Sequence, residues 1–148
     1  MKKLRDTACL ALFAAGLIGM FLPTGDSPPG LRSADQFWNL GHPVLFFLGA
    51  HIAYIFYPRL SSRTMYRQAL LLTAGALCAG TAIELSQSLI PGRFPSFYDM
   101  AANLSGALAY LSLKNRKQAK RYMLVHISAA CLIALVLWPP LKAVSDDI

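Results

Sequence analysis

Charge is the scarcest property of this sequence. Only 14% of its 148 residues are charged, whereas a soluble domain of this size carries roughly a quarter. Hydrophobic residues make up 55% of the chain. This balance disfavours a soluble globular domain and indicates a membrane protein, provided that the apolar residues form runs of sufficient length.

Cysteine pairs and catalytic motifs are also missing. The three cysteines, Cys9, Cys78 and Cys131, are odd in number, far apart and surrounded by apolar residues, so we expect them to be buried packing residues. The sequence contains no His-Glu-x-x-His motif, no nucleophile with an obvious base beside it and no internal repeat. We therefore predict no cofactor and no metal.

Long apolar runs are what the chain does contain. They predict an all-α protein, a single domain over 1–148 built as a transmembrane bundle of about five helices, with spans of approximately 4–22, 38–57, 69–90, 97–113 and 122–138. A spanning helix needs about 20 residues, with about 17 as a lower limit. No alternation of apolar and polar residues runs through these stretches, which disfavours strands.

The first apolar run has two interpretations. It follows a basic N-terminus and could be a cleavable signal peptide. However, no small-x-small cleavage site stands where the run ends at Leu22 and Pro23. We therefore favour a first helix that is retained.

The basic residues predict the orientation of the chain. Most of them fall before the first span, between the second and third, and between the fourth and fifth: Lys2, Lys3, Arg5, Arg59, Arg63, Arg67, Lys114, Arg116, Lys117, Lys120 and Arg121. Only Arg32, Arg93 and Lys142 lie on the other side. Short loops rich in Lys and Arg stay in the cytoplasm, so the N-terminus is expected inside and the C-terminus outside. The net charge of +7 then reflects orientation and contact with the lipid bilayer, and nucleic acid is not an expected partner.

Polar residues gather in one stretch, "IELSQSLIPGRFPSFYDMAANLSG". Glu84 and Gln87 are three residues apart and share a helix face near the outer end of the third span. Asp99 and Asn103 are four apart and share a face of the fourth span, and Asp99 suits its first turn. Arg93 lies in the short loop between them. Small residues on both helices predict a tight antiparallel hairpin, with Gly106 allowing close contact.

A third helix contributes His42, about one turn inside the second span, with Asn39 one turn earlier. Three helices therefore bring polar groups to the same side and depth, which predicts a polar cavity open to the outside. The alternative is a structural clasp in which Arg93 pairs with a carboxylate. His51 falls on the face opposite His42, and we expect it and His126 to have packing roles.

The pattern E-L-S-Q-x-x-x-P-G-R-F-P-S-x-x-D-M-x-x-N-x-x-G, from Glu84 to Gly106, resembles the signature of the VanZ-like membrane proteins. His42, followed by an apolar aromatic run, matches the histidine of that family at the start of a helix. The resemblance covers about 35–113. Many members carry a lysine three residues before the histidine, where this chain has Asn39. Some members continue into an extracytoplasmic domain of carbohydrate-binding type, and this chain ends about where such a domain would begin.

The resemblance implies a multi-pass protein of the bacterial cytoplasmic membrane, connected with tolerance of glycopeptide antibiotics and with the cell envelope or its polysaccharides. It implies no agreed biochemical activity.

Three functions remain open. The first is an accessory or binding protein for a lipid-linked glycan or another polar head group, in which Arg93 contacts phosphate or carboxylate while Glu84, Gln87 and Asn103 bind hydroxyls or amides. The second is an intramembrane hydrolase or transferase with His42 as general base and Glu84 or Asp99 as orienting carboxylate or acid. A metal held by His42, Glu84 and Asp99 is conceivable within that alternative. The third is a scaffold for membrane-protein partners.

Overall fold

The structure is a computed structural model that describes residues 2–21, 40–90 and 95–146. Within these residues the chain is all-α and contains no strand, as the sequence predicts. The helices are α1 (Lys2–Gly19), α3 (Gly41–Phe56), α4 (Met65–Gln87), α5 (Phe97–Lys114) and α6 (Met123–Asp146), with two short 3₁₀ helices, η1 (Pro58–Ser62) and η2 (Arg116–Gln118).

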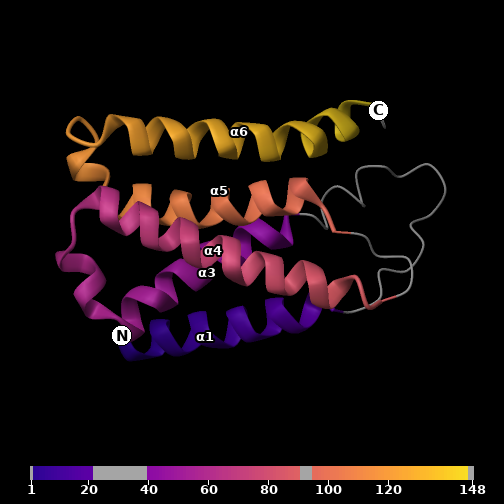
Figure 1. Ribbon diagram of the computed structural model, residues 1–148, viewed down its shortest axis with the longest axis horizontal. Coiled ribbons are helices and arrows are strands. Elements are labelled where there is room, and N and C mark those ends of the chain that lie inside the picture. Colours follow the sequence, from indigo (N-terminus) through magenta and orange to yellow (C-terminus); the bar gives the residue numbers. More distant parts are fainter. Residues whose placement is uncertain (1, 22–39, 91–94, 147–148) are drawn as a thin grey trace.

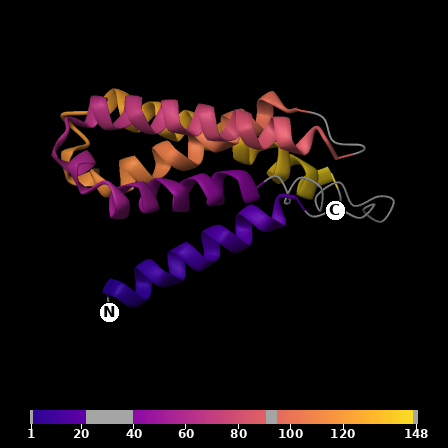
Figure 2. The same cartoon turned by 60° about the horizontal axis from the view of Figure 1, so that its bottom comes forward.

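Successive α-helices run in opposite directions, and the two ends of the chain lie at opposite ends of the molecule (Figure 1). α5 lies at the centre, where it packs against α3, α4 and α6. α1 packs against α3 and diverges from the other helices towards its N-terminal end (Figure 2). The arrangement brings the beginnings of α3 and α5 to the same end of the bundle as the end of α4.

Local capping sets several helix boundaries. The Thr64 side chain accepts a hydrogen bond from the Arg67 amide, so α4 begins at Met65, before the predicted start at 69. The Ser96 hydroxyl accepts one from the Asp99 amide and starts α5 at Phe97, as predicted. Side-chain oxygens at this position satisfy amides that the first helical turn leaves unpaired.

α6 continues to Asp146, past the predicted end of the last span at 138, although it contains Pro139 and Pro140. Proline has no amide hydrogen, so Pro140 cannot donate to the carbonyl of Val136 four residues earlier. The Tyr98 hydroxyl of α5 donates to that carbonyl instead. This side chain therefore supplies the hydrogen bond that the helix loses at Pro140.

Burial on α4 follows one stripe, spaced three or four residues apart: Met65, Gln68, Leu72, Ala76, Gly80, Glu84 and Gln87. The opposite side exposes large apolar residues, including Leu70, Leu71 and Leu85. Within the described chain, α4 and Met123–Lys142 of α6 are long and apolar enough to cross a membrane, whereas α3 is apolar but has only 16 residues. Two of the five expected spans thus meet the criteria of length and composition.

Glycines mark the closest helix contacts. A Cβ on Gly106 of α5 would lie 2.0 Å from the carbonyl oxygen of Pro43 in α3, and a Cβ on Gly80 of α4 would lie 2.6 Å from Nδ2 of Asn103. The prediction of close helix contact at Gly106 is confirmed, but the neighbour is α3, whereas the close approach of α4 to α5 lies at Gly80 and Asn103. The prediction of buried cysteines is wrong for Cys78 and Cys131, which are exposed. They lie on outward helix faces, where an apolar residue needs no protein neighbour if the surroundings are lipid.

Candidate functional site

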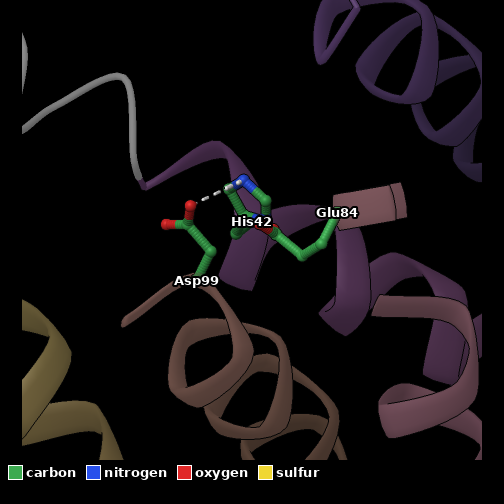
Figure 3. Close-up of side chains that lie close together, drawn as sticks. All are labelled: His42, Glu84 and Asp99. Atoms are coloured by element: carbon green, nitrogen blue, oxygen red, sulfur yellow. Dashed lines mark ion pairs between the residues drawn. The ribbon is translucent and has the colours of Figure 1, made fainter. Parts of the chain in front are cut away.

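Polar side chains from three helices meet at one end of the bundle. His42 lies in the first turn of α3, Glu84 in the last turn of α4, and Asp99 in the first turn of α5 (Figure 3). Asn103 follows Asp99 by one helical turn and lies on the same side of α5. His42, Glu84 and Asn103 are buried, while the Asp99 side chain keeps 17% of its surface exposed.

His42 contacts two residues of α5 through its two ring nitrogens. Nδ1 lies 3.0 Å from Oδ1 of Asn103, and Nε2 lies 3.8 Å from Oδ2 of Asp99. An amide oxygen accepts but cannot donate, so Nδ1 carries a proton in the pairing with Oδ1. Nε2 of the neutral ring then presents a lone pair towards Asp99.

Glu84 is held by the backbone rather than by a charged side chain. Its Oε2 accepts a hydrogen bond of 2.9 Å from the amide of Ser96, the residue that caps α5. Its Oε1 is buried, and within the part of the chain that the structure describes it has no hydrogen-bond partner. Buried polar atoms are nearly always paired, so this oxygen marks a position where a further group is expected.

These residues form a compact group. One ligand atom each from His42, Glu84 and Asp99 can be chosen so that all three atoms lie within 4.8 Å of one another. In Figure 3 the Asp99 side chain points towards the imidazole, and Glu84 extends towards the same ring from α4. An imidazole and two carboxylates at this separation can hold a cation, orient a water molecule or share a proton.

The structure does not bring every predicted site residue together. Gln87 shares the buried face with Glu84, but its Nε2 donates to the carbonyl of Met20, at a distance of 2.8 Å, and so ties α4 to the end of α1. Arg93 and Asn39 lie outside the described residues. The candidate site in the described chain therefore consists of His42, Glu84 and Asp99, with Asn103 behind the imidazole.

The remaining histidines lie elsewhere. His51 approaches Tyr110 of α5 through Nδ1 at 2.8 Å and Asp6 of α1 through Nε2 at 3.7 Å. The expected packing role fits these contacts. Tyr110 of α5 reaches His51, while Asp6 approaches it from α1. The separation of His42 and His51 onto opposite faces stays a prediction. His126 lies near the start of α6.

Sequence reasoning missed several polar contacts. Nothing in the sequence distinguishes Ser96 from the other serines of the polar stretch. Only the fold shows that its backbone amide donates a hydrogen bond to Glu84. Gln68 is buried at the other end of α4, where it accepts from the Tyr54 hydroxyl and donates to the carbonyl of Arg63. The sequence could have indicated the burial of Gln68, because Gln68 precedes Glu84 by sixteen residues and so lies on the same stripe of positions spaced four residues apart.

An apolar groove lies between the helices, and its lining does not include His42, Glu84, Asp99 or Asn103. It has a volume of about 610 Å³ and runs between α1, α3 and α4, from Leu60 of η1 to Ile83 of α4. Leu45 also lines it, one turn from His42, and Ile83 directly precedes Glu84. Sites for small ligands usually have volumes of about 300–1,000 Å³, so the groove is large enough for an extended apolar chain.

By fold and site, the chain is an all-α protein with a buried imidazole–amide–carboxylate cluster at one end of its helices. No protein-family model, curated protein or solved structure matches it.

Proposed function

We propose that the chain is a multi-pass protein of the bacterial cytoplasmic membrane, similar to the VanZ-like proteins, with its N-terminus inside and its C-terminus outside. The exposed leucines of α4, the alternating directions of the described helices and the concentration of Lys and Arg towards one end of the helices support this proposal. In this orientation His42, Glu84 and Asp99 lie near the outer surface.

In this proposal the cluster binds the polar head group of an envelope lipid, such as a lipid-linked glycan, and the groove holds part of its hydrocarbon chain. The observation that carries the proposal is that neighbouring residues of α4 serve the two features: Ile83 lines the apolar groove, and Glu84, the next residue, carries the buried carboxylate. Polar groups at membrane depth are costly and usually face a bundle interior or water. Arg93, in the adjoining loop, would contact a phosphate through its guanidinium.

Mass spectrometry of lipids tests this function. The wild-type protein is extracted with its native lipid and purified beside Arg93→Ala and the control Arg116→Ala, which removes an exposed cation of η2. We expect one class of phosphate-bearing lipid to be enriched in the wild type and in the control and to be depleted in Arg93→Ala. Equal lipid content in all three proteins contradicts the proposed function.

A second candidate function is hydrolysis or group transfer on the same lipid. The observation that favours it is the contact of 3.0 Å between His42 Nδ1 and Asn103 Oδ1, because an imidazole that donates through Nδ1 keeps at Nε2 the lone pair that a general base needs. Turnover of polyprenyl-linked substrates by the purified protein tests this candidate. Substrate that stays intact with the wild type removes it.

A further inference from the structure

We propose that His42, Glu84 and Asp99 bind a divalent transition-metal ion, with zinc as the ion expected from the ligand set. The ligands would be Nε2 of His42 and one carboxylate oxygen from each acid. From the sequence we predicted no metal, because no metal-binding motif is present, and a metal at these three residues was considered only within the enzyme alternative. Their placement by α3, α4 and α5 changes that expectation.

The three ligand atoms lie somewhat farther apart than they would around a bound zinc ion. The three ligand atoms lie within 4.8 Å of one another, and Nε2 of His42 is 3.8 Å from Oδ2 of Asp99. A tetrahedral zinc ion with bonds of about 2.0–2.1 Å separates its ligand atoms by about 3.3–3.4 Å. In the proposed site the ligand side chains would close this difference when the ion binds.

Asn103 prepares the imidazole for metal binding. Its Oδ1 lies 3.0 Å from Nδ1 of His42, which places the proton on Nδ1 and leaves the lone pair on Nε2. Metal-binding histidines usually donate their other ring N–H to a carboxylate, a carbonyl or water, which fixes the tautomer and the ring orientation. Asn103 is fully buried, so it is well placed to keep this orientation.

A buried carboxylate oxygen without a partner is a second observation that supports a bound ion. Glu84 is 5% exposed, and its Oε1 has no hydrogen-bond partner within the described chain. One carboxylate oxygen of Asp99 lies within 4.8 Å of one carboxylate oxygen of Glu84. A divalent ion bound between these oxygens would provide the missing partner for Oε1.

A comparison within the chain separates this group from an ordinary histidine–carboxylate contact. His51 has the same two features, since Nδ1 lies 2.8 Å from the Tyr110 hydroxyl and Nε2 lies 3.7 Å from Oδ1 of Asp6. Within the described residues, however, only the group at His42 contains a third ligand. His51 is therefore the matched control for His42.

The ligand set selects the kind of ion. One imidazole nitrogen and two carboxylate oxygens suit zinc or another divalent transition metal, whereas magnesium and calcium prefer oxygen ligands throughout. Three protein ligands leave one position of a tetrahedral ion for water or for an oxygen of another molecule. The inference concerns the ion alone and does not depend on the proposed binding of lipid.

Metal analysis of the full chain tests the site. The protein is purified with an affinity tag that lacks histidine, stripped with EDTA, incubated with zinc and desalted. We expect about one zinc ion per chain in the wild type and in His51→Gln, and a loss of about tenfold or more in zinc affinity in His42→Gln, Glu84→Gln and Asp99→Asn. Manganese retained by the same three residues also supports the site.

Two further measurements keep the test decisive if a variant folds poorly. Zinc should raise the thermal unfolding temperature of the stripped wild type, because a ligand that binds only the folded state stabilises it. Arg93→Ala should bind as much zinc as the wild type. Three results would overturn the proposal: no zinc retained by the wild type, equal zinc in the His42 and His51 variants, or zinc binding that begins only when Arg93 is removed.

Discussion

Nδ1 of His42 and Oδ1 of Asn103 lie 3.0 Å apart although 61 residues separate them in the chain. The contact joins α3 to α5 and lies beside the points where Gly106 meets Pro43 and Gly80 meets Asn103. Residues that hold the helices together therefore also form the candidate site. A substitution at such a residue can change stability and ligand binding together, so each test below needs a control variant.

Asn103→Leu should weaken metal binding without removing a ligand. The substitution deprives the Nδ1 proton of His42 of its acceptor, so the imidazole loses its fixed orientation. We expect zinc affinity to fall by about 10- to 100-fold in competition with a chelating dye. Ser105→Ala is the control, because Ser105 is equally buried and its hydroxyl bonds only to its own helix at Ala102. Unchanged affinity in Asn103→Leu would show that the amide does not orient the ring.

Gly106→Ala should separate α3 from α5. The new Cβ would lie 2.0 Å from the backbone oxygen of Pro43, which cannot rotate away as a side chain can. We expect a loss of about 1–3 kcal/mol or more in the free energy of unfolding, with weakened zinc binding because His42 moves with Pro43.

Gly75→Ala is the matched control for Gly106→Ala. Gly75 lies within α4, and a Cβ there meets nothing within 4 Å. Since alanine favours helix over glycine, this variant should unfold at the same temperature as the wild type or slightly higher. Equal stability of the two variants, measured by thermal unfolding in the same detergent, would show that the α3–α5 contact is looser than the structure has it.

Tyr98→Phe should destabilise α6 at its proline pair. The variant leaves the carbonyl of Val136 without a donor, and we expect a cost of about 1–3 kcal/mol in unfolding free energy. In a Pro140→Ala background the new amide can donate to Val136, so the same change should cost less. A double-mutant cycle measures the difference. If Tyr98→Phe costs the same in both backgrounds, the hydroxyl does not replace the missing helical hydrogen bond.

Labelling of cysteines tests the proposed orientation. Cys9, Cys78 and Cys131 are first replaced by alanine, and single cysteines are then introduced as Ser27→Cys, between α1 and α3, and Ser61→Cys, in the exposed η1 segment. A maleimide that cannot cross membranes should label Ser27→Cys on intact spheroplasts. Ser61→Cys should react only after permeabilisation. The reverse pattern would invert the topology and place His42 at the cytoplasmic surface.

Local patterns in the sequence were sufficient to predict part of the fold and of the site. Helix class, the start of α5 and the shared faces of Glu84 with Gln87 and of Asp99 with Asn103 follow from residue spacing within one helix. Spacing within a helix cannot show what lies across from it. The partner of Gln87 is a backbone carbonyl of α1, and that of Glu84 is the Ser96 amide, so both depend on how helices pack.

The continuation of α6 through Pro139 and Pro140 illustrates the same limit. The predicted span ends at 138, directly before the two prolines, which lack the amide that a helix interior needs. The donor that makes the continuation acceptable comes from Tyr98, on another helix. Only the packed structure brings a hydroxyl to the carbonyl that proline leaves unpaired.

The most direct test of whether the cluster is a functional site or a structural clasp is Glu84→Gln, examined for fold and for bound ligands in one preparation. The substitution keeps the size of the side chain and can still accept from the Ser96 amide, but it removes a buried charge. Native mass spectrometry would be run on each protein as purified, and thermal unfolding on the same preparation after metal and lipid are removed, because bound ligands stabilise the wild type. A functional site predicts that the stripped variant unfolds at or above the temperature of the stripped wild type, and that the purified variant lacks the bound lipid and metal. A clasp predicts loss of stability with unchanged ligands, and that result would contradict the account.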